Sequence, residues 1–126
     1  MPPSTNQIRD AVAGYITTVS TGTSAEIAAL YAEDATLEDP VGSEIKVGRA
    51  QIEKFYSALD SIDSTAELLT VRSGGSTAAF HFRVTSHLPD QTVVVEPIDV
   101  MTFDDDLKIT SMRAVWAPED VIASQR

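Results

Sequence analysis

Cysteine is absent from the sequence, which excludes disulfides, a thiolate nucleophile and any zinc site built on cysteine. Long apolar runs are absent too, because none reaches the roughly 20 residues needed to cross a bilayer. Residues 1–10 also lack the apolar core of a signal peptide, so we expect a cytoplasmic protein. No Ser–His–Asp order, His-x-x-x-His pair or glycine-rich phosphate loop occurs, and we expect neither a metal nor a cofactor.

Basic residues are few: nine Lys and Arg stand against nineteen Asp and Glu, giving a formal net charge of −10. Such a chain is repelled by a phosphate backbone and by anionic lipid, so we expect neither nucleic acid nor membrane as a partner. The 126 residues, 43% of them apolar, are enough for one domain with its own core. We therefore treat residues 1–126 as a single domain without linker or repeat.

The segment 91–103, QTVVVEPIDVMTF, has the longest β-branched run and predicts the longest strand. Side chains alternate on a strand, so one face carries a carboxyl within an apolar row: Val93, Val95, Pro97, Asp99, Met101 and Phe103. Burying an ionised carboxylate is costly, so Asp99 is expected to hold a proton and act as a donor. The opposite face is too apolar to meet water alone and suggests a covering second subunit; it carries Val94, Glu96, Ile98 and Val100.

Apolar residues recur at helical spacing in three segments of the first half. The first helix begins after residue 3 and is capped by Ser4 or Thr5. The second opens with Thr23 and Glu26, which have capping-box spacing. The third covers residues 49–60. The inward residues of these helices include Tyr15, Tyr31 and Tyr56.

Strands are expected after the helices, at residues 66–72, 77–86, 91–103 and 107–116, with a short strand ending at Glu38 before the third helix. Three helices followed by a strand meander predict an α+β domain: a cone-shaped, curved antiparallel sheet with three helices on its concave face. Such a cone encloses a cavity for small apolar ligands. Arg113 is expected to be buried and to pair with a carboxylate such as Glu38, while His81 and His87 are expected to face solvent.

Three acid–base groups are candidates for chemistry: Tyr15 on an inward helical face, Asp39 before a proline, and Asp99 in its apolar row. Each has a structural alternative. An inward tyrosine is often a core residue with a satisfied hydroxyl. Asp-Pro is often only a turn. Asp99 could make a structural hydrogen bond, or a bulge at Pro97 could shift the register.

The order of these motifs resembles that of bacterial Δ5-3-ketosteroid isomerases, within the wider nuclear-transport-factor-2-like cone folds. The resemblance covers nearly the whole chain. Its specific segments are Glu38-Asp39-Pro40-Val41-Gly42-Ser43 and Pro97-Ile98-Asp99. Further matches are Tyr15, the segments 30–36 and 111–114, and Phe55-Tyr56.

The resemblance implies a cofactor-free isomerase that acts on a small apolar steroid. The apolar outer face of the predicted sheet adds the expectation that the protein is a homodimer. Asp39 matches the general base, and Tyr15 and Asp99 match the donors of the oxyanion hole. Tyr31 and Tyr56 match tyrosines that hydrogen-bond behind Tyr15 in some members. The steroid pocket would be lined by Phe82, Val84, Val95, Met101, Met112, Ala114 and Trp116.

Two alternatives remain at this point. One is another enzyme of the same fold, such as a polyketide cyclase or dehydratase, which would use a His–Asp or Asp–Arg–Asp arrangement that cannot be placed here. The other is a steroid or lipid carrier, which would keep the apolar pocket but would not need Tyr15, Asp39 and Asp99 together.

Overall fold

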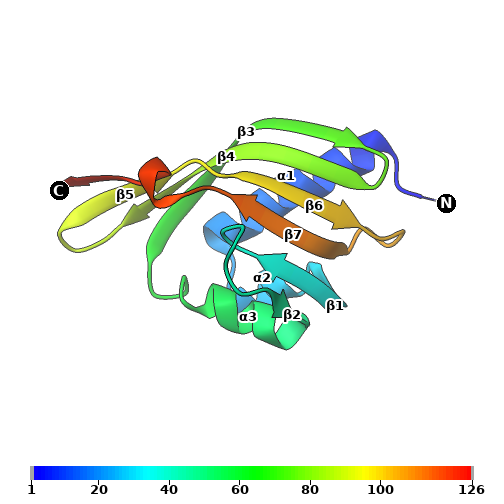
Figure 1. Cartoon of the computed structure of the whole chain (residues 1–126), viewed down its shortest axis with the longest axis horizontal. Helices are drawn as coiled ribbons and strands as arrows, with labels where there is room; N and C mark the ends of the chain where they lie inside the picture. Colours follow the sequence, from blue (N-terminus) through cyan, green and yellow to red (C-terminus); the bar gives the residue numbers. More distant parts are fainter. Residues whose placement is uncertain (1, 126) are drawn as a thin grey trace.

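The computed structural model describes residues 2–125 and consists of a curved sheet with helices on one side (Figure 1). The first half contains the helices and two strands: α1 (Thr5–Thr21), α2 (Ser24–Ala28), β1 (Tyr31–Glu38), β2 (Lys46–Val47) and α3 (Arg49–Ser57). The second half contains β3 (Asp63–Gly74), β4 (Thr77–His87), β5 (Gln91–Val95), β6 (Ile98–Phe103), β7 (Ile109–Val115), a 3₁₀ turn (Pro118–Asp120) and β8 (Ile122–Gln125). The predicted cone of helices and curved sheet is confirmed.

The sheet is mixed, which corrects the prediction that it is antiparallel throughout. Its eight strands run in the order β2-β1-β7-β6-β4-β5-β8, with β3 paired to β4. β1 and β7 are parallel, and the other pairs are antiparallel. A parallel pair needs a long connection, and here residues 39–108 provide it. The sequence pattern shows strand positions but not which strand lies beside β1.

The segment 91–103 forms two strands rather than the one long strand that was predicted, and β3, with twelve residues, is the longest. The break falls at Glu96 and Pro97, where proline has no N–H for a ladder bond. The predicted alternation nevertheless holds across β6, because Asp99 and Met101 are buried and Ile98 is exposed. The register expected for Asp99 is therefore confirmed.

The helix termini largely agree with the sequence. Ser4 caps α1 in a reciprocal capping box, and the Thr23–Glu26 box opens α2. Tyr31 is the first residue of β1, not part of a helix, and α3 ends at Ser57 instead of residue 60. The strand β8 was not predicted; it pairs with β5 and all four of its residues are exposed.

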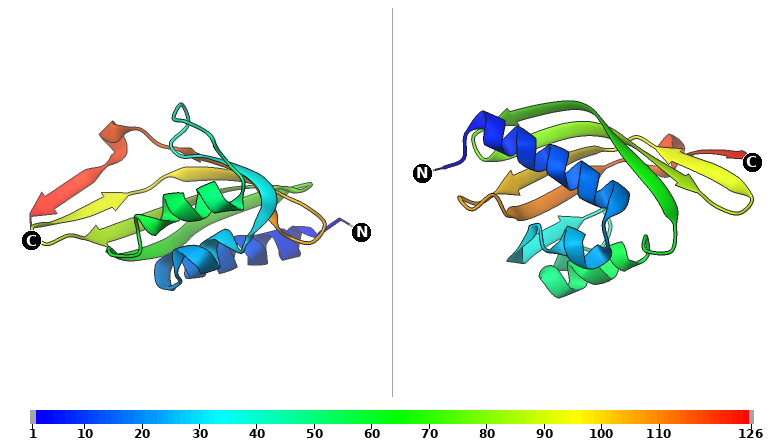
Figure 2. Two further views of the ribbon diagram at one scale, coloured as in Figure 1. Left: turned by 90° about the horizontal axis from the view of Figure 1, so that it is seen from below. Right: turned by 180° about the vertical axis from the view of Figure 1, so that it is seen from behind.

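The helices cover only one face of the sheet. Figure 2 shows α1 lying across the strands and α2 and α3 closing the adjacent side, while Figure 1 shows the strands uncovered on the other face. The core lies between the sheet and the helices and includes Ile8 and Val12 of α1 with Phe80 of β4. No helix within residues 2–125 is long and apolar enough to cross a bilayer.

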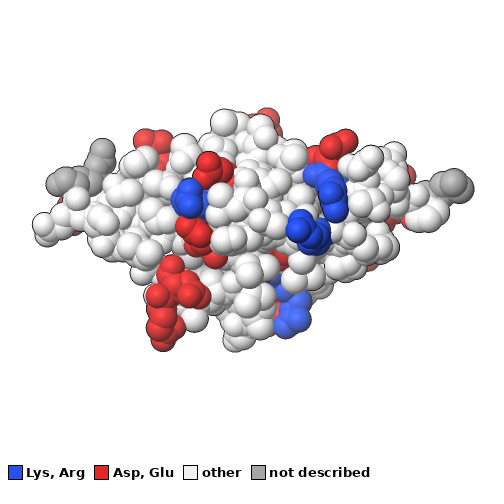
Figure 3. Space-filling model, turned by 90° about the horizontal axis from the view of Figure 1, so that it is seen from above, with Lys and Arg blue, Asp and Glu red and all other residues white. Residues whose placement is uncertain are grey.

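Charged side chains lie in small groups on the face drawn in Figure 3, separated by uncharged surface. An ion-pair cluster links β3, β4 and the segment before β6: Arg83 binds Glu67 at 2.7 Å and Glu96 at 2.9 Å. His81 also contacts Glu96, at 3.1 Å, and is partly exposed. These are surface pairs, so they contribute little to stability.

Candidate active site

Three tyrosine hydroxyls form a buried hydrogen-bonded chain between α1, α3 and β1. The hydroxyl oxygen of Tyr56 lies 2.9 Å from that of Tyr15 and 2.7 Å from that of Tyr31. Burial raises the pKa of all three phenols well above the usual value. Each therefore keeps its proton at neutral pH. If Tyr31 donates to Tyr56 and Tyr56 donates to Tyr15, the hydroxyl of Tyr15 can donate its own hydrogen bond to a ligand.

Asp99, the second residue of β6, is a buried carboxyl with 1% of its surface exposed. Its strand neighbours are Phe80 on β4 and Ala114 on β7. Among the described residues, its Oδ1 has no hydrogen-bond partner. Burial, and secondarily the charge of Asp39, raises the pKa of Asp99 well above its ordinary value. Both influences favour the protonated form of Asp99, and its Oδ1 is available to a ligand. That Asp99 is a neutral donor at neutral pH stays a prediction from the sequence.

Asp39 follows the last residue of β1 and is half-buried. Its Oδ1 accepts a hydrogen bond of 2.7 Å from Nε1 of Trp116. Burial raises the pKa of Asp39, and the bond from Trp116 lowers it again in part. Partial desolvation makes this carboxylate a better proton acceptor, while the indole N–H stabilises its charged form.

One cavity brings Tyr15, Asp39 and Asp99 together. It has a volume of about 250 Å³, somewhat below the roughly 300–1,000 Å³ usual for small-molecule sites. Apolar side chains make up the rest of its lining apart from Tyr56: Val19, Phe55, Ala58, Leu59, Phe82, Val84, Val95, Pro97 and Trp116. The three acid–base groups therefore face one apolar space.

Four of the seven predicted pocket-lining residues border this cavity: Phe82, Val84, Val95 and Trp116. The other three, Met101, Met112 and Ala114, are buried in the core and do not border it. They lie on the inner face, as expected, but core side chains cover them. Tyr31 also lies outside the lining and reaches it through Tyr56.

Residues missed by the sequence analysis come mainly from the ends of α1 and α3. Val19, Phe55 and Leu59 border the cavity. Val19 and Phe55 belong to apolar faces of α1 and α3, and Leu59 lies two residues after α3, where the sequence predicts that this helix continues. Their spacing could have identified them, because a helix that covers a cavity presents the same face to the cavity as to the core. Ala58 carries no such signal.

Arg113 is exposed, not buried as predicted: 59% of its side chain is accessible. The expected pairing with Glu38 is present, at 3.0 Å between Nε and Oε1. The error has a simple cause, since Arg113 follows Met112 on β7 and alternation places it on the outer face. Among residues 2–125, no group of three potential ligands could hold a metal ion.

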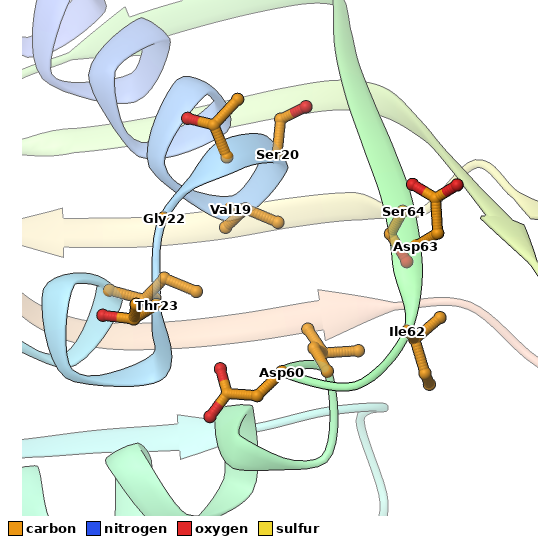
Figure 4. A pocket seen from close by; sticks show the side chains of 11 residues that line it. Val19, Ser20, Gly22, Thr23, Asp60, Ile62, Asp63 and Ser64 are labelled. Atoms are coloured by element: carbon orange, nitrogen blue, oxygen red, sulfur yellow. The ribbon is translucent and has the colours of Figure 1, made fainter.

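A second hollow, of about 290 Å³, lies where α1 ends and β3 begins (Figure 4). It shares Val19 and Leu59 with the first cavity but is lined mainly by hydroxyl and carboxylate groups. Its Asp60 accepts hydrogen bonds from the N–H and the hydroxyl of Ser24, at 3.0 and 2.8 Å. That carboxylate ties α2 to the segment after α3, which is a structural role.

Comparisons with known proteins show which family the chain resembles. The family model for the SnoaL-like domain matches residues 12–112. A curated protein of Nocardioides simplex, named Steroid Delta-isomerase, is 57% identical over 118 residues, which cover 94% of this chain and 96% of that protein. A solved structure from work on the epoxide hydrolase/cyclase-like enzyme SalBIII, in pyran ring formation in polyether salinomycin, has a TM-score of 0.85 and 28% identity, covering 92% of this chain and 95% of that one. The chain therefore belongs to the steroid Delta-isomerase family of SnoaL-like domains.

Proposed function

We propose that this chain is a cofactor-free steroid Δ-isomerase, which moves the double bond of 3-oxo-Δ5-steroids to the conjugated Δ4 position. The observation that carries this proposal is the meeting of Asp39, Tyr15 and Asp99 in one apolar cavity. The relative at 57% identity, whose name states this activity, supports the same reaction.

Asp39 is the proposed general base. Its carboxylate takes a proton from the carbon between the ketone and the double bond, and the electrons of that C–H bond move toward the ketone oxygen. The resulting dienolate then receives the same proton back two carbons away, so no net proton is gained or lost. The partly desolvated carboxylate, held by Trp116, suits both transfers.

Tyr15 and Asp99 are the proposed donors to the oxygen that becomes negative. Burial raises the pKa values of both, which favours the protonated forms that this donation requires. Donors already in place in a site that excludes water stabilise a developing oxyanion without reorganisation. The bond from Tyr56 to Tyr15 would strengthen the donation through the tyrosine chain.

The apolar lining would hold the steroid rings. Phe82 and Val84 of β4 and Val95 of β5 offer one wall, and Phe55 and Leu59 of the α3 region offer another. A rigid hydrocarbon in such a space displaces water from the three acid–base groups. We expect binding to depend on the lining and turnover on the polar groups.

We further propose that two copies pair through the outer sheet face. Ile98 and Val115 lie opposite each other on β6 and β7, and they are 49% and 52% exposed. An apolar patch uncovered by any helix fits burial against a second copy, because exposed apolar surface is unfavourable in water. The cytoplasmic location stays a prediction from the sequence.

The test is conversion of 5-androstene-3,17-dione to its conjugated 4-ene, followed by the rise in ultraviolet absorbance. We expect rapid conversion without added metal or cofactor. Bound steroid without conversion would favour a carrier instead. The cyclase or dehydratase alternative draws on the neighbour at 28% identity, but neither His81 nor His87 borders the cavity, so a His–Asp pair is not formed there.

A further inference from the structure

The segment that follows β1 presents Asp39 to the cavity from a tight turn at the surface. The N–H of Ser43 donates to the carbonyl oxygen of Pro40 at 3.0 Å, and Gly42 has a φ of 102°. That left-handed conformation suits the third residue of a type II turn and favours glycine. Surface turns are usually among the more mobile parts of a fold, whereas a proton-transferring group must be held in place.

Glu38 anchors this turn through two hydrogen bonds to its side chain. Its Oε2 accepts a hydrogen bond of 2.9 Å from the N–H of Gly42, which closes the turn. Its Oε1 accepts one of 3.0 Å from Nε of Arg113, its register partner on β7. Only 15% of the Glu38 side chain is accessible, so the carboxylate lies against the turn and not in open solvent.

The strand β7 and the residue that follows it, Trp116, supply two more bonds to the same segment. The carbonyl oxygen of Ala114 accepts from the N–H of Val41 at 2.8 Å, and Trp116 donates to Asp39. Asp39 is therefore held through its own side chain and through contacts on both sides of it in the chain. Of these anchors, only Glu38 binds both the turn and β7 through its side chain.

We propose that Glu38, oriented by Arg113, is a positioning residue for Asp39: it fixes the turn that aims the catalytic carboxylate at the substrate. This inference rests on the proposed function, since it requires Asp39 to be the base. Glu38 itself does not border the cavity, so any effect on turnover must act through Asp39. The bonds from Gly42 and then from Arg113 lower the pKa of Glu38, so the carboxylate stays ionised at neutral pH.

The test compares three variants by their kcat and KM for 5-androstene-3,17-dione. Glu38→Ala should lower kcat by about tenfold or more, because displacement of a reacting group by about 1 Å can cost up to about 100-fold. KM should change little, since no steroid contact is lost. Glu38→Gln keeps an acceptor for Gly42 and should recover most of kcat. The control is Glu44→Ala, which removes a charge from the same loop but only a contact of 3.4 Å to Lys46.

A double-mutant cycle separates positioning from a general structural effect. In an Asp39→Asn background there is no base to position, so adding Glu38→Ala should not lower the residual turnover further. Equal losses in both backgrounds would mean that Glu38 acts on the fold or the pocket, and would overturn the positioning role, as would normal kcat in Glu38→Ala. Near-normal turnover of Asp39→Asn alone would instead overturn the proposed function.

Discussion

Asp99 offers the sharpest test of the chemistry, because its carboxyl is buried, its pKa is raised by that burial, and within the described residues its Oδ1 has no hydrogen-bond partner. In the proposed reaction it donates to the oxyanion beside Tyr15. Asp99→Ala removes that donor and leaves the apolar lining in place. We expect kcat to fall by about 100- to 1,000-fold, which corresponds to about 2.7–4 kcal/mol of lost transition-state stabilisation.

The comparison with Asp99→Asn identifies the role of the carboxyl. An amide has nearly the same size and also donates, so this variant should stay within about tenfold of the native kcat. The assay is the initial rate of 4-ene formation at saturating steroid. If the Asn and Ala variants were equally impaired, a neutral donor at Asp99 would be the wrong role. If neither were impaired, Asp99 would be structural and the oxyanion would be held elsewhere.

The raised pKa of Asp99 also predicts a dependence of stability on pH. Its folded-state pKa lies above the unfolded value, so folding favours the protonated form. The stability that this proton provides is complete below the unfolded pKa and is lost as pH rises toward the folded pKa. Asp99→Asn has no such proton to lose. Chemical denaturation between about pH 4 and pH 8 should show the free energy of unfolding of the Asn variant increasing relative to that of the native protein as pH rises. A difference in free energy that stays constant with pH would contradict the pKa shift.

Three further outcomes are expected. Asp39→Asn should lower turnover by about two to four orders of magnitude while the affinity for the 4-ene product persists, and near-normal turnover would exclude it as the base. Tyr56→Phe breaks the chain to Tyr15 and should lower kcat by about three- to tenfold, since one hydrogen bond contributes about 0.5–1.5 kcal/mol; an unchanged kcat would make the chain structural. Ile98→Glu should give monomers in sedimentation equilibrium at micromolar concentration, where the native chain is expected to be a dimer; a monomeric native chain would refute the proposed pairing.

Sequence patterns predicted well those features of secondary structure that depend on residues close together in the chain. The capping boxes at Ser4 and Thr23 depend on residues three positions apart, and both are present. The alternation through Asp99 depends on neighbours two positions away, and it holds in β6. What such patterns cannot show is pairing at long range, so the parallel contact of β1 with β7 was missed.

The pocket was predicted less well, because facing inward and bordering a cavity are different properties. Met101 is two residues beyond Asp99 on the same face of β6, yet only Asp99 borders the cavity. In a cone, the inner face passes from open cavity to closed core within a few residues, and the depth at which this happens depends on the helices above. Alternation along a strand reports the face and contains no information about that depth.

The two carboxyls of the site, Asp39 and Asp99, differ in their surroundings, and these surroundings come from residues far away in the sequence. Both are aspartates near a proline, and burial raises the pKa of each. Asp39 receives an N–H from Trp116, 77 residues away, whereas Asp99 has strand neighbours that offer its Oδ1 no partner. A donor to the carboxylate favours the charged form, and apolar surroundings favour the neutral one. One residue type can therefore supply both a base and an acid in a single cavity, and the charge on Asp39 adds to this division by raising the pKa of Asp99 further.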